Sequence, residues 1–270
     1  MPSEHFIQMG KRKVHYYQYG SGSKTIIGLH GWPGAGTDFA RIKVPEGWKL
    51  IAPDLPGCGS SEPLGQRHTV SAYAGWLEAF TEALGIISCV VESICGTSPI
   101  AIKFANRRQK VKALIFHYFP FIHPGLITWK SKLPLVGYAG NSMLGKAILN
   151  ILRSSNWYME RNFIQGLPQE AAVSGNIDIH NKRVANLDAA TDFFHSLMHT
   201  DLRQDWKSLN MPILILAAEN DHSINQRKAY PLAKRPNVIL AIITSAHHYW
   251  DNNYVAAQNA ELEDFLDSLA

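Results

Sequence analysis

The sequence predicts an α/β fold in which a mostly parallel sheet, flanked by helices, is interrupted by a helical insertion. Short β-branched segments alternate with helical segments up to about residue 118 and again after residue 211. Between about residues 119 and 203 the alternation stops, and the sequence becomes helical and aromatic. A chain of 270 residues fits one domain with an insertion. We therefore expect a core of residues 1–118 and 204–270 and a cap of residues 119–203.

The first elements are strand-type segments at residues 6–9 and 14–19, separated by a glycine-containing turn that indicates a hairpin. Buried-type strands follow at 25–29 and 49–52, and each leads into a loop rich in glycine and proline. A single apolar stripe at three- and four-residue steps predicts a helix over 70–84, ended by Gly85.

Beyond that helix, the pattern predicts a strand, a helix and a second strand, at residues 88–93, up to about 105, and 111–117. After the insertion come two further strands and a closing helix, at residues 213–217, 238–243 and 253–269. Strands that alternate with helices imply parallel pairing with right-handed crossovers.

Composition argues against several classes of partner. The net charge is +4, and the 26 Lys and Arg residues are scattered, which is typical of solvated surface rather than a nucleic-acid or membrane patch. No run of 18 apolar residues occurs, and the first residues lack the apolar core of a signal peptide. Three cysteines without metal or disulfide spacing favour a reducing cytoplasm. We expect a small-molecule substrate and make no prediction of oligomeric state.

Four segments in a characteristic order carry a family resemblance. They are His30-Gly31-Trp32-Pro33-Gly34, residues 52–61, Ser93-Ile94-Cys95-Gly96-Thr97, and residues 217–221 with the later Ala246-His247-His248-Tyr249. Over residues 5–118 and 205–265 the chain resembles the α/β-hydrolase superfamily, in its capped branch of esterases, epoxide hydrolases and haloalkane dehalogenases. The resemblance implies an α/β-hydrolase fold and a nucleophile on a tight strand-to-helix turn.

The family usually writes that turn G-x-S-x-G, which is absent here, so Cys95 and Ser93 compete for the nucleophile position. With Ser93, the β-branched Val91 would occupy a crowded turn position, and Pro99 would lie deeper in the helix. With Cys95, Pro99 falls in the first turn, where its missing N–H does no harm. We therefore expect Cys95 to be the nucleophile. Glu92 then lies on the preceding strand at a position that should be apolar, which a buried, hydrogen-bonded carboxylate would explain.

A thiol nucleophile needs a base and an acid that orients the base. His248 occupies the position of the family histidine, with His247 as the alternative. Asp221 follows the strand at 213–217 where the family acid lies, with Glu219 as its rival. A Cys–His pair can rest as thiolate and imidazolium, which sharpens the nucleophile near neutral pH.

Backbone N–H groups of Trp32 and Gly96 would form the oxyanion hole. The Trp32 side chain is expected either in the substrate pocket or in the core. His30 is a candidate for the pocket too, although a histidine in this loop more often braces the backbone. We predict no cofactor and no metal site: His195 and His199 lack a clear third ligand, and the glycines of residues 31–36 form no dinucleotide fingerprint.

The sequence thus predicts a hydrolase of a small, largely apolar ester, thioester or lactone that works through an acyl-cysteine. Alternatives are an acyltransferase that uses the same thioester, and a degenerate, non-catalytic small-molecule binding protein. Dehalogenase or epoxide hydrolase turnover is disfavoured, because an alkyl thioether on Cys95 would offer water no carbonyl carbon.

Overall fold

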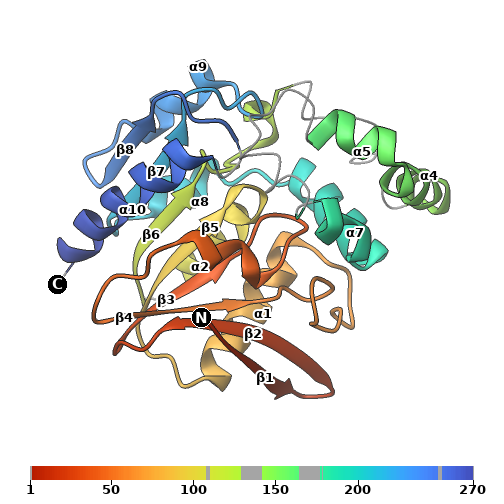
Figure 1. Ribbon diagram of the computed structural model, residues 1–270, viewed down its shortest axis with the longest axis horizontal. Coiled ribbons are helices and arrows are strands. Elements are labelled where there is room, and N and C mark those ends of the chain that lie inside the picture. Colours follow the sequence, from red (N-terminus) through yellow and green to blue (C-terminus); the bar gives the residue numbers. More distant parts are fainter. Residues whose placement is uncertain are drawn as a thin grey trace.

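The computed structural model describes residues 2–107, 110–128, 142–163, 177, 179–248 and 251–269. A sheet of strand order β1-β2-β4-β3-β5-β6-β7-β8 runs through the molecule (Figure 1). Its strands are β1 Ser3–Met9, β2 Arg12–Gly20, β3 Lys24–Leu29, β4 Trp48–Pro53, β5 Cys89–Ile94, β6 Val111–His117, β7 Ile213–Ala218 and β8 Val238–Ile243. The predicted strands at 111–117 and 238–243 are confirmed to the residue, and the others begin and end within a few residues of the prediction.

Strands β1 and β2 form the predicted antiparallel hairpin, and β2 also pairs antiparallel with β4. From β4 through β8 the pairing is parallel, as the alternation of strands and helices predicts. The side chains of β5 and β7 are buried throughout, which is normal for strands covered on both faces. The carboxyl ends of β3, β5, β6, β7 and β8 consequently meet at one edge, where ligands bind in sheets of this type.

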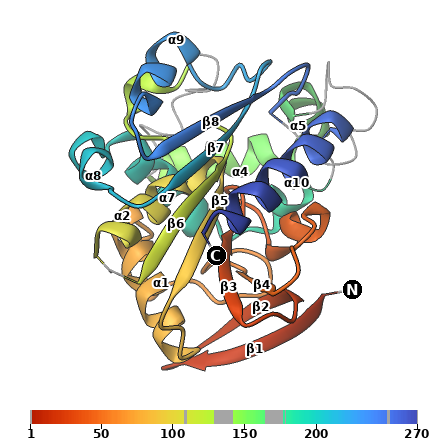
Figure 2. The same ribbon diagram turned by 90° about the vertical axis from the view of Figure 1, so that its left-hand side faces the viewer.

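Helices cover both faces of the sheet (Figure 2). On one face lie α1 (Val70–Ala83), α2 (Ser98–Arg107) and α8 (Arg203–Ser208), which share an apolar layer around Phe80, Phe104 and Trp206. On the other face lie the short helix η1 (Gly36–Arg41) and the closing helix α10 (Asn252–Asp267), packed through Phe39, Tyr254 and Phe265.

The ends of α1 follow from local chemistry. At the N-terminus Thr69 accepts a hydrogen bond from the Ala72 N–H, and just after the C-terminus Gly85 has a φ of +67. The apolar stripe of α1 contributes Tyr73, Leu77 and Phe80 to the core, as its spacing predicts.

Between β6 and β7 the described segments are mainly helical. They are η3 Pro124–Leu126, α4 Met143–Ser154, α5 Asn156–Phe163, α7 Leu187–Met198 and then α8. Residues 129–141, 164–176 and 178 lie outside the described residues, so the cap boundaries 119–203 stay a prediction. Among the residues that the structure describes, no helix has the length and apolar composition needed to cross a bilayer.

Candidate active site

The turn after β5 holds Cys95 at the carboxyl edge of the sheet. Cys95 has φ +51, a left-handed conformation that few side chains adopt, and it begins the short helix η2 (Cys95–Thr97) before α2. The Thr97 hydroxyl lies 3.2 Å from the Leu29 carbonyl oxygen and 3.0 Å from that of Ile94. The Ser98 hydroxyl donates to the Cys95 carbonyl at 2.8 Å. These bonds fix the turn from several sides.

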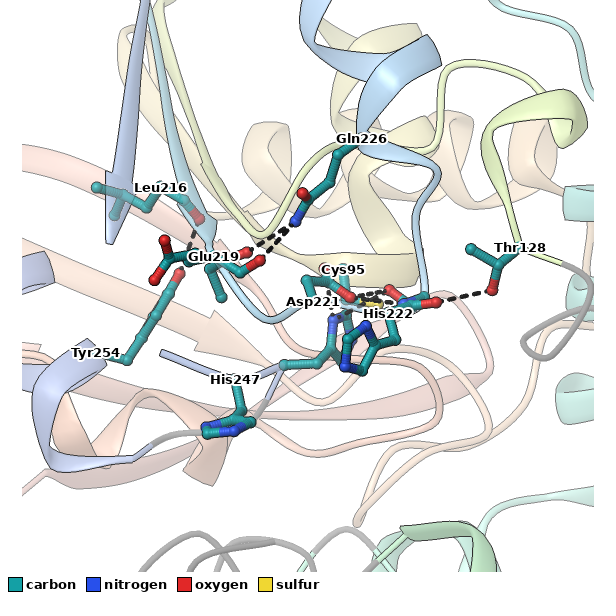
Figure 3. Close-up of polar contacts among 12 residues, drawn as sticks. Cys95, Thr128, Leu216, Glu219, Asp221, His222, Gln226, His247 and Tyr254 are labelled. Atoms are coloured by element: carbon teal, nitrogen blue, oxygen red, sulfur yellow. Dashed lines mark hydrogen bonds and ion pairs between the residues drawn. The ribbon is translucent and has the colours of Figure 1, made fainter. Parts of the chain in front are cut away.

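The structure brings the three predicted catalytic side chains together, and Figure 3 shows two of them, Cys95 and Asp221, close to one another. The Cys95 Sγ lies 3.1 Å from His248 Nε2. On the other side of that ring, His248 Nδ1 lies 2.9 Å from Asp221 Oδ2. Asp221 comes from the loop after β7 and His248 from the loop after β8, so three separate strand ends supply one chain of contacts.

The alternative residues have other surroundings. Ser93 is fully buried within β5, and its hydroxyl has no hydrogen-bond partner among the described residues. The Glu219 carboxylate accepts from the Ser245 backbone N–H at 2.8 Å. His247 pairs with Asp251, with its backbone N–H 2.9 Å from that carboxylate, and it lies apart from Cys95 and Asp221 in Figure 3. Tyr249, the aromatic after the histidine pair, lies outside the described residues.

Electrostatics favour a charged histidine in this chain of contacts. Burial opposes the charged form of His248, but the negative charges and hydrogen bonds of Asp221 and Cys95 raise its pKa well above the ordinary value. Burial likewise opposes ionisation of Asp221, but the His248 charge and hydrogen bonds from His248 and Ser223 bring the pKa of Asp221 below its usual value. The arrangement therefore suits a carboxylate next to an imidazolium.

Cys95 differs from the other two cysteines in its exposure. Cys58 and Cys89 are buried, and burial raises the pKa of both thiols, that of Cys89 to about 12. Cys95 is only partly buried. Of the three thiols in the chain, Cys95 alone combines access with a neighbouring base.

Sequence reasoning missed two residues that contact Asp221 and His248. The Ser223 backbone N–H and hydroxyl donate to Asp221 Oδ1 at 2.8 and 2.5 Å, and the same hydroxyl lies 3.2 Å from His248 Nδ1. Tyr118 stacks on the His248 ring with centroids 4.3 Å apart. A serine two residues after an acid and a tyrosine at a strand end carry no distinctive sequence signal.

The two predicted oxyanion residues lie side by side. A Cβ built on Gly96 would lie only 3.3 Å from the Trp32 Cβ, so glycine allows this close approach. The Trp32 ring packs against Phe193 of α7 and Tyr73 of α1, with centroids 4.3 and 5.3 Å away. Trp32 is partly exposed, and its ring contacts α7. The predicted backbone role of Trp32 and Gly96 remains a prediction.

His30 has a structural environment. Its side chain is fully buried, its Nδ1 bonds the Gly31 carbonyl at 2.7 Å, and its Nε2 accepts from the Leu55 N–H at 2.9 Å. Burial also lowers the pKa of His30, in keeping with a neutral ring. His30 thus braces the loop, and the pocket role expected for it does not match this geometry.

His195 and His199 lie together on and just after α7, with ring centroids 4.2 Å apart. The described residues contain no group of three or more histidine, cysteine or acidic side chains arranged to hold a metal ion.

Comparisons with known proteins agree with this architecture. A family model described as alpha/beta hydrolase fold matches residues 24–118. A 2-hydroxy-6-oxononadienedioate/2-hydroxy-6-oxononatrienedioate hydrolase of Dechloromonas aromatica is 31% identical over 114 residues. That match covers 38% of this chain and 39% of the relative's length.

Similar solved structures cover nearly the whole chain. An N-acyl homoserine lactonase, AidH, has a TM-score of 0.78 at 18% identity and covers 100% of this chain and 98% of its own. A thermophilic esterase from Thermogutta terrifontis has a TM-score of 0.78 at 15% identity, covering 100% and 99%. An epoxide hydrolase from Mycobacterium thermoresistibile has a TM-score of 0.76 at 15% identity, covering 99% and 98%. At these identities the likeness shows the fold alone.

Proposed function

We propose that this chain, which has the α/β-hydrolase fold, is a hydrolase that cleaves a small, largely apolar ester, thioester or lactone through an acyl-Cys95 intermediate. The observation that carries the proposal is the 3.1 Å contact between Cys95 Sγ and His248 Nε2 at the carboxyl edge of the sheet. A thiol beside an imidazole that is itself oriented by a carboxylate is the arrangement that nucleophilic acyl transfer requires.

In the acylation step, the Cys95 sulfur attacks the substrate carbonyl carbon and its proton resides on His248. The resulting oxyanion would lie against the backbone N–H groups of Trp32 and Gly96. Collapse of this intermediate breaks the bond to the leaving oxygen or sulfur, which takes the proton from His248. Asp221 keeps the imidazole in the required orientation throughout.

In the deacylation step, His248 removes a proton from water, and the hydroxide attacks the Cys95 thioester carbonyl. The acid product leaves, and the Cys95 sulfur is restored next to the protonated ring. This second step explains the preference for acyl substrates. A thioester retains a carbonyl carbon that water can attack, whereas a thioether from an epoxide or alkyl halide has none.

Turnover of p-nitrophenyl butyrate by the wild type and by Cys95→Ala tests the proposal. Loss of a triad nucleophile is expected to lower kcat by about 10³-fold or more. Cys89→Ala, which removes a buried thiol from β5, the strand that leads to Cys95, is the matched control and should keep wild-type turnover. Equal hydrolysis by Cys95→Ala and wild type would exclude Cys95 as the nucleophile.

Mass spectrometry of the quenched reaction adds an independent readout, because the acyl group should be found on the peptide that contains Cys95. Adding an alcohol acceptor separates hydrolysis from acyl transfer through the product formed. Iodoacetamide labelling across pH identifies a degenerate binding protein: Cys95 would then react no faster than an ordinary thiol with a pKa of about 8.5.

A further inference from the structure

The ring of the proposed base, His248, is the first of three stacked aromatic rings. Tyr118, which directly follows β6, faces His248 with centroids 4.3 Å apart and ring planes 29° from parallel. Tyr118 also stacks on Tyr254 of α10, with ring centroids 4.9 Å apart and ring planes 21° from parallel. Tyr118 is 2% exposed and Tyr254 is fully buried. We call His248, Tyr118 and Tyr254 the aromatic stack.

A second histidine and carboxylate hold the far end of the aromatic stack. The Tyr254 hydroxyl donates to the Leu216 carbonyl at 3.1 Å and lies 3.2 Å from His117 Nδ1. His117 Nε2 in turn bonds Glu92 Oε1. Glu92 and His117 are fully buried. Glu92, an unexpected residue for an interior strand, therefore has a polar partner in His117. His117 in turn contacts Tyr254, the last ring of the aromatic stack.

The backbone of Tyr118 is held in a conformation that large side chains rarely adopt. Its φ is +67, and its N–H donates to the Leu216 carbonyl at 2.9 Å. Among the described non-glycine residues, positive φ occurs also at Cys95 and Ser245. All three adjoin the candidate site, since Ser245 begins the turn that leads to His248. Such conformations persist where the surroundings determine them, and they cluster at functional sites.

We infer that Tyr118 is a positioning residue for His248, and that Glu92, His117 and Tyr254 hold the Tyr118 ring in place. The His248 ring can turn about its Cβ–Cγ bond, and such a rotation would carry its nitrogens away from Cys95 and Asp221. A ring stacked on its face restricts that rotation. The negative face of a phenol ring also favours a positive charge on the imidazole.

The expected effect of Tyr118 on kcat rests on the proposed function, whereas the position and pKa of the His248 ring can be measured without any substrate. Among the described residues, those that contact His248 include Cys95 from the turn after β5, Asp221 and Ser223 from the loop after β7, and Tyr118 from the end of β6. In its own loop, His247 pairs with Asp251, and Glu219 binds the Ser245 N–H. Replacement of Tyr118 by an aliphatic residue removes its ring and introduces no charge among the other groups.

NMR of the ring protons of His248 tests the stack without any turnover. The chain has 12 histidines, and loss of a signal in His248→Gln assigns the relevant one. Ring currents of Tyr118 should shift the His248 ring protons upfield in wild type and in Tyr118→Phe. Tyr118→Leu should lose this shift and lower the pKa of His248. Ordinary wild-type shifts, or an unchanged pKa in folded Tyr118→Leu, would overturn the inference.

The kinetic arm uses p-nitrophenyl butyrate. Tyr118→Phe should keep the wild-type kcat, whereas Tyr118→Leu should lower kcat by about 10- to 100-fold with KM little changed, since a misplaced base affects the chemical step. Tyr254→Phe, which keeps the ring but loses its hydroxyl bonds, should lower kcat less. Tyr19→Leu is the control, because Tyr19 is also buried but lies on β2. A Tyr118→Leu variant with wild-type kcat would contradict the inference.

If Tyr118→Leu does not fold, Tyr118→Met takes its place. If neither variant folds, the ring protons of wild-type His248 provide the test: an upfield shift supports the inference, and ordinary shifts overturn it. The two proposals fail in different ways. A wild type that shows the stack but hydrolyses no acyl substrate would refute the proposed function alone. A wild type that hydrolyses through Cys95, with Tyr118→Leu unchanged in His248 pKa and kcat, would refute the positioning role alone.

Discussion

Thr97 stands at a position where the family motif has glycine, two residues after Cys95. The structure supplies a reason for the larger residue, because the Thr97 hydroxyl reaches the carbonyl oxygens of Leu29 and Ile94. These carbonyls end β3 and β5, the two strands that carry Trp32 and Cys95 on their following loops. The Thr97 hydroxyl therefore joins the end of β3 to the end of β5, and so the loop of Trp32 to the turn of Cys95.

Thr97→Val should lower the free energy of unfolding by about 1–2 kcal/mol, because it keeps the shape but removes the hydroxyl from two buried carbonyls. Urea denaturation measures this, and Thr97→Ser should retain most of the stability. Thr191→Val serves as a matched control: its hydroxyl is 2.9 Å from Leu187 O within α7, whose carbonyls already accept helical bonds. Equal losses at both positions would argue against a special role for Thr97.

At the scale of single residues, the sequence predicts those site residues that belong to a recognisable motif. It does not predict those that join the site only through a contact in space. Cys95, Asp221 and His248 stand at recognisable places after strands, so their convergence follows from the parallel topology. Ser223 and Tyr118 reach His248 only through loop and stacking geometry, which no spacing rule encodes. The oddity of Glu92 on a buried strand was visible in the sequence, but its partner His117 lies on a different strand.

At the scale of the elements, the strands were predictable because β-branched runs separated by turn residues are local signals. The end of β8 and the start of α10 show what local signals leave out. Asp251 accepts from the Tyr254 N–H at 2.8 Å as the N-cap of α10, and it also accepts from the His247 N–H at 2.9 Å. One carboxylate thus begins the closing helix and fixes the loop that carries His248.

Asp251→Ala should lower the free energy of unfolding by about 1–2 kcal/mol through loss of the cap. It should also lower kcat, because the loop of His248 loses its attachment to α10. Asp251→Asn, which keeps one carbonyl oxygen for the cap, should lose less stability. Thr69→Ala is the control, since it removes the N-cap of α1 and should lower stability without lowering kcat. If Asp251→Ala and Thr69→Ala lowered kcat to the same extent, Asp251 would have no specific role in holding the loop of His248.

For the whole molecule, the shifted titrations of Asp221 and His248 predict how stability depends on pH. The lowered pKa of Asp221 stabilises the fold above the ordinary aspartate value of about 4, and this contribution is lost as pH falls through the folded-state pKa. The raised pKa of His248 stabilises the fold fully below the ordinary histidine value of about 6.5, and this contribution is lost as pH rises through the folded-state pKa.

The difference in unfolding free energy between wild type and His248→Asn should therefore be largest at about pH 5–6. It should shrink towards strong acid and towards alkaline pH. Urea denaturation of both proteins across the pH range measures it. A difference that stays constant with pH would mean that the two groups titrate alike in the folded and unfolded chains.

The packing of Trp32 bears on whether the segment between β6 and β7 can be exchanged. Its Cβ lies next to Gly96, while its ring packs on Phe193 of α7 at a centroid distance of 4.3 Å, so this one residue contacts both the turn after β5 and α7. A chimera that grafts a foreign insertion onto this core would remove the ring that supports Trp32. We expect such grafts to need a compensating aromatic at the position of Phe193, because the segment between β6 and β7 and the loop of Trp32 pack on one another.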